Sequence, residues 1–237
     1  MKTIGLIGGM GWQSTLQYYH AINSEISARL GGSHSARIII DSHDFHSIAN
    51  ASTKAEYMAV QSLLVDSAQR LELAGADCVA MACNTVHRLA SKVAAAVDIP
   101  LLHIADATRD ALVRDGHSRV GILGTRATME GSFYRSQMGG EIELIVPDNS
   151  GMNSVNQVAR DINRGCSAEQ YLPTMQEAVD TLLAQGCTAV ILACTEFALV
   201  FGQTRQELAV TLYDSARLHA LALVEFALAE PIRLQET

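Results

Sequence analysis

The chain contains 237 residues, of which 49% are hydrophobic and 18% are charged. This composition excludes an intrinsically disordered chain, because disorder combines low hydrophobicity with high charge. The length allows one large domain or two small ones that need no disulfide or metal staple. A net charge of −8 without a basic run argues against nucleic acid or an anionic membrane as a partner. The longest apolar runs are too short to predict a membrane-spanning helix.

The N-terminal segment predicts a buried strand rather than a signal peptide. Residues 1–9 read MKTIGLIGG, with one lysine and a very short apolar run that ends in glycines. The cysteines are odd in number and lack CxxC spacing, so free thiols in a reducing cytoplasm are expected. They are Cys78, Cys83, Cys166, Cys187 and Cys194.

Short apolar, β-branched runs alternate with helix-length segments along the chain. Strands are predicted, in chain order, at Thr3–Ile7, Arg37–Ile40, Cys78–Ala82, Leu101–His103, Arg119–Leu123, Ile142–Val146, Ala189–Ala193 and Val210–Tyr213. Helices are predicted at Ser14–Arg29, Lys54–Ala74, Thr85–Ala96, Ala105–Asp115, Met129–Met138, Ser154–Arg164, Ala168–Gln185 and Tyr213–Leu228. Apolar strands that alternate with helices are typical of a parallel sheet covered on both faces. We therefore expect an α/β fold.

Two sequence patterns recur in the same order at nearly the same separation. The run Ile4–Gly9 resembles Val120–Thr125, an offset of 120 − 4 = 116 residues. The run Gly75–Thr85 resembles Gly186–Glu196, an offset of 186 − 75 = 111 residues. Any two strand–helix units share some features, but here glycines, strand and cysteine recur together. The repeat therefore predicts two similar α/β halves.

Each half contains a strand that ends at Ala-Cys, before a small polar residue and a predicted helix. Ligands bind beyond the carboxyl ends of strands in open α/β sheets, so Cys83 and Cys194 would face one cleft if the halves face each other. A helix N-terminus would lower the pKa of each thiol. One thiolate can remove a proton from carbon while the opposite thiol returns one to the other face. Such a pair inverts a stereocentre without a metal or organic cofactor, and cysteine, with an unperturbed pKa of about 8.5, suits this work.

A purely structural interpretation fits the other cysteines, because free cysteine often behaves as a small buried hydrophobe. Cys78 and Cys187 lie near the starts of the two matched strands, and Cys166 lies in a polar loop. Cys83 and Cys194 differ from these three because both take the same place in the repeat and both precede polar helix starts.

The residues beside the two cysteines predict a small carboxylate ligand. The turn Gly8–Gly11 allows close backbone approach and presents N–H groups to an anion. It lacks the G-x-G-x-x-G spacing and an acidic residue about 20 positions later, which argues against a dinucleotide. Thr125 lies in the matching turn of the second half. Four further residues supply donors suited to an α-carboxylate and an amine, although each also fits a helix-capping role: Asn84, Thr85, Thr195 and Glu196.

The eight histidines show no metal-ligand spacing. His43 and His46 flank Asp44, but no H-x-x-x-H or H-E-x-x-H helix accompanies them, so we predict no metal site. His87 follows Cys83 by about one helical turn and fits either a supporting partner of that cysteine or a surface position. His219 lies on a late apolar helix and is interpreted as a hydrogen-bonded core residue.

Six short segments, spread over nearly the whole chain, form a specific combination. They are residues 8–15 (GGMGWQST), 44–45 (DF), 82–87 (ACNTVH), 103–108 (HIADAT), 123–129 (LGTRATM) and 193–196 (ACTE). In this combination and order, the chain resembles the cofactor-independent aspartate/glutamate racemase family.

The resemblance implies two pseudo-symmetric, Rossmann-like α/β domains with the active site between them. The first would comprise residues 1–104 with 212–237, because the C-terminal helix returns to it, and the second residues 105–211. The resemblance also implies an amino-acid or small carboxylate substrate, no cofactor and a homodimer. It assigns the two catalytic roles to Cys83 and Cys194, and substrate contacts to Met10, Asn84, Thr85 and Thr195.

One departure from the family concerns the distal carboxylate of the substrate. Many members carry basic or amide side chains near it, whereas this chain has Ser52 and Ser154 at the corresponding places. A buried carboxylate needs a paired charge or several donors. The basic residues that could take the place of the missing side chains are Lys54, Arg160 and Arg164.

Two alternatives to a two-cysteine racemase stay open at the level of sequence. A similar cysteine pair can serve an isomerase of unsaturated diacids, in which one cysteine attacks as a nucleophile. The other alternative is a small-acid-binding protein that has lost turnover, for which Ser52 and Ser154 are the sequence support.

Overall fold

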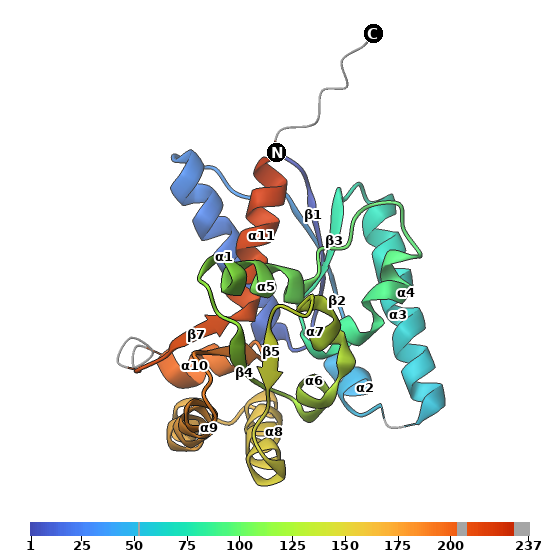
Figure 1. Ribbon diagram of the computed structural model, residues 1–237. Coiled ribbons are helices and arrows are strands. Elements are labelled where there is room, and N and C mark those ends of the chain that lie inside the picture. Colours follow the sequence, from blue (N-terminus) through green and yellow to red (C-terminus); the bar gives the residue numbers. More distant parts are fainter. Residues whose placement is uncertain (52, 203–207, 230–237) are drawn as a thin grey trace.

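Two parallel β-sheets organise the molecule (Figure 1), which confirms the predicted α/β class. The computed structural model describes residues 1–51, 53–202 and 208–229. The first sheet has the order β2-β1-β3 and the second the order β5-β4-β6-β7, with every pair parallel. The strands are β1 Ile4–Gly8, β2 Ile38–Ser42, β3 Cys78–Met81, β4 Arg119–Gly124, β5 Glu143–Ile145, β6 Ala189–Ala193 and β7 Thr211–Asp214.

Helices connect successive strands, both within each sheet and between the two sheets, and one more helix follows the last strand. They are α1 Trp12–Leu30, α2 Phe45–Ala49, α3 Lys54–Leu73, α4 Ala90–Ala94, α5 Ile104–Arg114, α6 Arg126–Glu130, α7 Ser132–Gln137, α8 Asn149–Asn163, α9 Leu172–Ala184, α10 Phe197–Phe201 and α11 Ser215–Leu228, with 3₁₀ helices η1 Thr85–Leu89 and η2 Glu169–Tyr171. Local sequence explains several starts. Thr53 and Glu56 form a reciprocal capping box for α3, while Asp148 and Asp214 cap α8 and α11. None of the described helices is long and apolar enough to span a membrane.

The internal repeat reproduces the strand register of one sheet in the other. In the first sheet, Ile4 of β1 is paired with Cys78 of β3. Adding the two sequence offsets gives 4 + 116 = 120 and 78 + 111 = 189, and Val120 of β4 is indeed paired with Ala189 of β6. The matched strands β1 and β4 are therefore inner strands of their sheets, and the matched cysteines follow the equivalent neighbouring strands β3 and β6.

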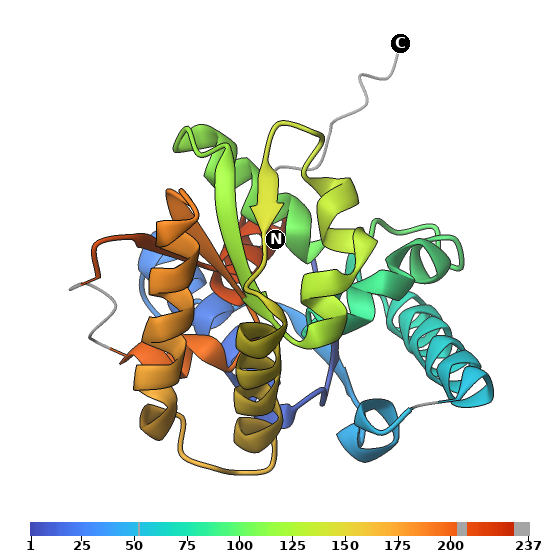
Figure 2. The same ribbon diagram turned by 60° about the horizontal axis from the view of Figure 1, so that its bottom comes forward.

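Both faces of each sheet are covered (Figures 1 and 2). In the first sheet, Leu6 of β1 packs with α1 and α11, while the adjacent Ile7 packs with α3 and α4 on the opposite face. In the second sheet, Leu123 of β4 packs with α8 and α9, while Ile122 packs with α5 and α7. Alternate strand residues point to opposite faces, so two-sided coverage requires the continuous apolar strands seen in the sequence.

The helix α11 joins the two parts of the molecule. It contacts α1, which covers the first sheet, and α5, which covers the second. The preceding strand β7 lies in the second sheet, where Leu212 is paired with Val190. The division into units 1–104 with 212–237, and 105–211, stays a prediction. Because a boundary at residue 212 would divide β7, we would place the return to the first unit at Ser215.

Four predicted elements differ in the structure. The predicted strand Leu101–His103 forms only one bridge, between Leu101 and Val79, because His103 already caps α5 by accepting a hydrogen bond from the Ala105 N–H. The predicted helix Thr85–Ala96 is divided into η1 and α4, and Met129–Met138 is divided between α6 and α7. The predicted helix Ala168–Gln185 is divided between η2 and α9. The short helices α2 and α10 were not predicted, because segments of five residues carry little periodic signal.

Candidate active site

The two matched cysteines lie beyond the carboxyl ends of strands in different sheets. Cys194 directly follows β6 and is buried, and Cys83 follows β3 by one intervening residue and is half-buried. The two sulfur atoms are close enough to interact electrostatically, since the charge of Cys83 contributes to raising the pKa of Cys194. The structure thus brings together the two thiols that the repeat singles out.

Burial raises the pKa of both thiols, which corrects the expectation that helix N-termini lower it. Burial is the largest cause and takes the pKa of Cys83 to about 11, with the charge of Glu196 adding to the rise. Backbone N–H groups of Val86 and Thr85 act in the opposite direction. Burial and Glu196 likewise raise the pKa of Cys194. The following helices, η1 and α10, have five residues each, so their dipoles are too small to overcome desolvation.

A hydrogen-bonded network links Cys194 to the first half of the chain. The Cys194 thiol donates to Oε2 of Glu196 over 3.0 Å, and the Thr195 hydroxyl donates to the same oxygen over 2.9 Å. The Ser14 hydroxyl donates to Oε1 of Glu196 over 2.7 Å and lies 2.6 Å from the Thr195 hydroxyl. All four side chains are buried. The predicted site residues Thr195 and Glu196 therefore surround Cys194, and Ser14 on α1 joins them.

A second polar network lies beside Cys83. The Thr85 hydroxyl is 2.9 Å from that of Thr125 and 3.2 Å from that of Thr128, which are themselves 3.0 Å apart. Thr85 follows β3 whereas Thr125 and Thr128 follow β4, so this triangle also spans the two sheets. Hydroxyl groups can both donate and accept, which suits them to the polar groups of an amino acid.

Asn84 is held by its neighbours rather than left open. Its amide donates to the Ser215 hydroxyl over 3.0 Å, and its carbonyl oxygen accepts from the Tyr134 hydroxyl over 3.0 Å. Ser215 donates onward to the Leu192 carbonyl over 2.8 Å, which ties the start of α11 to β6. The Asn84 side chain therefore braces the strand end that carries Cys83.

The glycine turn after β1 packs closely against the protein itself. Gly9 has a φ of 84°, and a Cβ there would overlap the backbone of His43. The Gly9 N–H donates to the Thr15 hydroxyl over 2.8 Å. Met10 is buried in the core of the first sheet, and no hydrogen bond links this turn to either cysteine among the described residues.

His87 supports the segment that carries Cys83. The Ile104 N–H donates to Nε2 of His87 over 3.3 Å, so Nδ1 carries the proton and donates to the Cys83 carbonyl over 2.9 Å. Because the imidazole takes this carbonyl, the His87 N–H bonds instead to Asn84, three residues back, which is 3₁₀ geometry. Burial lowers the pKa of His87 well below its usual value, so the ring is neutral. The supporting interpretation of His87 is confirmed over the surface one.

His219 and His43 form hydrogen bonds within the fold. His219 accepts from the Tyr18 hydroxyl at Nδ1 and donates from Nε2 to the Leu102 carbonyl, each over 2.9 Å, which confirms a hydrogen-bonded core residue. His43 bonds to Ser67 over 3.1 Å. Within residues 1–51, 53–202 and 208–229, no three histidine, cysteine or acidic side chains gather as metal ligands.

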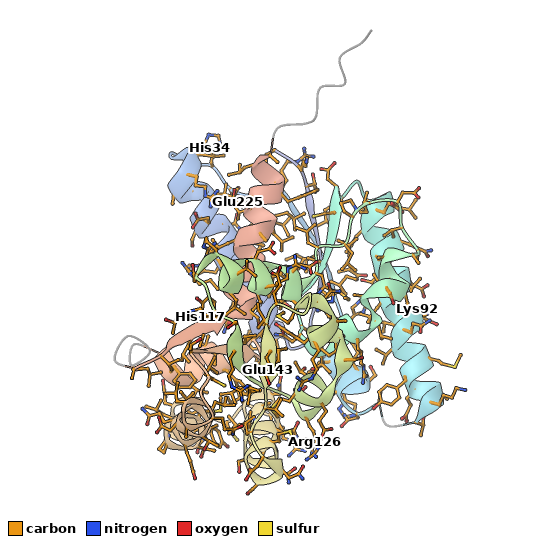
Figure 3. All side chains as sticks on the ribbon, viewed as in Figure 1. His34, Lys92, His117, Arg126, Glu143 and Glu225 are labelled. Atoms are coloured by element: carbon orange, nitrogen blue, oxygen red, sulfur yellow. The ribbon has the colours of Figure 1, made fainter. Side chains whose placement is uncertain are left out.

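The side chains considered for a distal carboxylate lie on the surface. Lys54, Arg160, Arg164 and Ser154 are all exposed, and Ser52 lies outside the described residues. Arg126 is half-buried between α6 and α8 (Figure 3), but its guanidinium is already bonded to Asn149, Asn153 and Glu130. In the described chain, no lysine or arginine side chain hydrogen-bonds to the networks around the two cysteines.

Four residues of these networks were not singled out from the sequence: Ser14, Thr128, Tyr134 and Ser215. Ser14 and Thr128 lie inside segments that carry the family resemblance, so a closer look at hydroxyls near the glycine turns could have found them. Tyr134 and Ser215 have no local signal, because only the tertiary fold brings them to Asn84.

Known proteins resemble this chain in both sequence and fold. The family model described as Asp/Glu/Hydantoin racemase matches residues 7–223. The crystal structure of a candidate Asp/Glu racemase from Yersinia pestis has 39% sequence identity, covers 97% of this chain and 100% of its own, and superposes with a TM-score of 0.87. An aspartate racemase homologue from Pyrococcus horikoshii has 30% identity, coverage of 96% and 99%, and a TM-score of 0.80.

Among curated proteins, the broad specificity amino-acid racemase RacX of Bacillus subtilis is 24% identical over 229 residues, which is 95% of this chain and 98% of RacX. The family match spans both sheets, and the Yersinia similarity extends over essentially the whole fold. The chain belongs to the Asp/Glu/Hydantoin racemase family.

Proposed function

We propose that the protein is an amino-acid racemase that needs no pyridoxal phosphate and uses Cys83 and Cys194 as its two acid–base groups. One observation carries this: thiols at equivalent positions of the repeat follow strands of two different sheets and lie close enough for the charge of Cys83 to raise the pKa of Cys194. Membership of a racemase family supports the reaction class.

In the proposed reaction, one cysteine enters as thiolate and the other as thiol. The thiolate removes the α-proton of the bound amino acid, and the opposite thiol protonates the carbanion on its other face. The hydroxyls of Thr85, Thr125 and Thr195 supply hydrogen bonds for the α-carboxylate and the ammonium group. A bound ammonium group also brings positive charge into the site, which favours the thiolate that burial otherwise opposes.

We further propose that the substrate side chain need not carry a second carboxylate. The cations considered for such a group are exposed, and the buried charged side chain beside Cys194 is the acidic Glu196, which repels a carboxylate. The description of RacX as a broad specificity amino-acid racemase supports a wide substrate range. The homodimer and the cytoplasmic location stay predictions, and sedimentation at twice the mass of one chain would support the dimer.

The test follows α-proton exchange in D₂O by proton NMR, over a panel of L- and D-amino acids with no cofactor added. Exchange on several neutral amino acids is expected, and exchange confined to aspartate and glutamate would contradict the proposed substrate range. Cys83→Ser and Cys194→Ser should each reduce racemisation at least about 100-fold, the lower range for a lost acid–base group. Cys166→Ser, an exposed cysteine outside the site, is the matched control.

Full racemisation by either site variant would refute the two-cysteine mechanism. Two outcomes correspond to the alternatives. A covalent adduct with maleate, seen by intact-protein mass spectrometry, would favour an isomerase of unsaturated diacids. Saturable binding of small acids with no exchange across the panel would favour a binding protein.

A further inference from the structure

The two cysteines are matched by the repeat, but their immediate partners are not. The offset of 111 residues relates Cys83 to Cys194 and Thr85 to Glu196, since 85 + 111 = 196. Thr85 presents a neutral hydroxyl that bonds to Thr125 and Thr128. At the equivalent position, Glu196 presents a carboxylate that accepts the hydrogen of the Cys194 thiol over 3.0 Å. The two cysteines therefore occupy equivalent positions, but only Cys194 has a carboxylate beside it at the equivalent place.

Glu196 is a buried carboxylate that is satisfied by neutral donors. Its side chain is 4% exposed, and Ser14, Thr195 and Cys194 all donate hydrogen bonds to it. Among the described residues, no lysine, arginine or histidine forms an ion pair with it. A buried anion of this kind is stabilised by every donor that it retains, and the Cys194 thiol can donate only while it is protonated.

We propose that Glu196 is a positioning residue that keeps Cys194 in the thiol form, so that Cys194 is the proton donor and Cys83 the base of the free enzyme. The roles of donor and base rest on the proposed racemase function, whereas the state of the Cys194 thiol does not. Ionisation of Cys194 would remove a donor from Glu196 and place two negative charges in contact. Ionisation of Cys83 costs less, because it removes no hydrogen bond from Glu196 and because the Cys83 sulfur is approached by the backbone N–H groups of Thr85 and Val86.

The ionisation behaviour of the two thiols agrees with this geometry. The charge of Glu196 raises the pKa of both, but only Cys194 also hydrogen-bonds to the carboxylate. The other charged group that influences Cys83 is Arg88, which lowers its pKa. The free enzyme is then ready to deprotonate the enantiomer whose α-hydrogen faces Cys83, and each turnover leaves the opposite, less stable protonation state.

The direct test measures the rate of iodoacetamide alkylation at each cysteine against pH, with peptide mass spectrometry to separate Cys83 from Cys194. The thiolate is the reactive form, so the midpoint of each profile reports the ionisation of that cysteine. In Glu196→Gln, the Cys194 midpoint should fall by about one pH unit or more, which is about a tenfold faster reaction below the midpoint. The Cys83 midpoint should move less.

Two further variants sharpen this test. Ser14→Ala removes one donor from Glu196 without touching Cys194, so the carboxylate accepts more strongly from the thiol and the Cys194 midpoint should rise. Glu177→Gln makes the same chemical change on the exposed face of α9 and should leave both midpoints unchanged. Opposite shifts in the two site variants are the expected result, and Ser14→Ala decides the matter if Glu196→Gln does not fold. An unchanged Cys194 midpoint in the folded site variants would overturn the proposal.

A second assay reads one cysteine at a time. In HCl elimination from 3-chloroalanine, one base takes the α-hydrogen, the C–Cl bond breaks and chloride leaves. The resulting 2-aminoacrylate hydrolyses to pyruvate and ammonia. The enantiomer still processed by Cys83→Ser identifies the face served by Cys194. We compare the elimination rates of the two enantiomers. In Glu196→Gln, the rate for the enantiomer served by Cys194 should rise about tenfold relative to the rate for the other enantiomer, in line with a shift of one pKa unit. An unchanged ratio of the two elimination rates would refute the roles assigned to Cys83 and Cys194. Absence of α-proton exchange in the unmodified enzyme would refute the racemase function, but the alkylation result would still report the state of the Cys194 thiol.

Discussion

Lowering the pH should destabilise the fold through His219, whose imidazole is fully buried. Both ring nitrogens are engaged, with Nδ1 accepting from the Tyr18 hydroxyl and Nε2 donating to the Leu102 carbonyl. A second proton on the ring would displace the Tyr18 hydrogen bond and place a charge close to His87 and within electrostatic reach of His103. Burial accordingly lowers the pKa of His219 from 6.5 to about 4.

The sign and size of the effect follow from linkage. Because the pKa of His219 is lower in the folded state, the unfolded state binds the proton first as the pH falls below 6.5. Stability is therefore lost with decreasing pH until the pH passes the folded-state pKa of about 4. The shift corresponds to about 3 kcal/mol once the pH is below that value, and about 2 kcal/mol is already lost at about pH 5.

The assay is urea unfolding at pH 7.5 and at pH 5, for the unmodified protein and for His219→Gln. Buried His87 and half-buried His103 have pKa values lowered in the same direction, so the unmodified protein loses more stability than the share of His219 alone. The loss between the two pH values should be about 2 kcal/mol smaller in His219→Gln. Exposed His34, which lies beyond the end of α1 (Figure 3), supplies the control variant His34→Gln. Equal pH dependence in His219→Gln and the unmodified protein would refute the reasoning.

Two further predictions concern the core of the first sheet. A Cβ on Gly5 would lie 2.8 Å from the Cys78 carbonyl oxygen and 2.9 Å from the Ala76 Cβ, so Gly5→Ala should lower the free energy of unfolding by about 1–3 kcal/mol in a urea titration. Leu223→Ala should cost about 2–5 kcal/mol because its fully buried side chain packs against α1. Leu73→Ala, at a side chain that is 87% exposed, should stay within about 0.5 kcal/mol. A Leu223→Ala cost no larger than that of Leu73→Ala would contradict the packing described for α11.

The fold class and the two similar halves could be predicted because their signals are local or repeated. Uninterrupted apolar runs mark strands that are buried on both faces, and the Ile4–Gly9 pattern recurs at Val120–Thr125 in strands that take equivalent places in the two sheets. Short elements could not be predicted. The division between η1 and α4, for example, depends on the His87 imidazole taking the Cys83 carbonyl, and that contact exists only once the tertiary structure has formed.

The candidate site could also be predicted only in part. Cys83 and Cys194 stand out in the sequence because the repeat matches them, and Thr85 and Thr195 stand out as hydroxyl donors beside them, with the family resemblance pointing to the same residues. The expected direction of the pKa shift of the two cysteines was wrong. The sequence indicates that a helix follows each cysteine, but it indicates neither the length of that helix nor how deeply the thiol is buried. The contact between Ser14 and Glu196 joins residues 182 positions apart, which no local pattern predicts.

The position of α11 has a consequence for the order in which the protein folds during synthesis. Ile26 of α1 and Leu223 of α11 share one apolar cluster, yet they are 223 − 26 = 197 residues apart. At ribosomal rates of about 5–20 residues per second, the apolar face of α1 waits roughly 10–40 s for its cover. The second sheet and the helices α5 to α10 form from one continuous stretch and are complete first. The part of the chain that leaves the ribosome earliest is thus among the last to close its core, and α1 is the segment on which a nascent-chain chaperone would act.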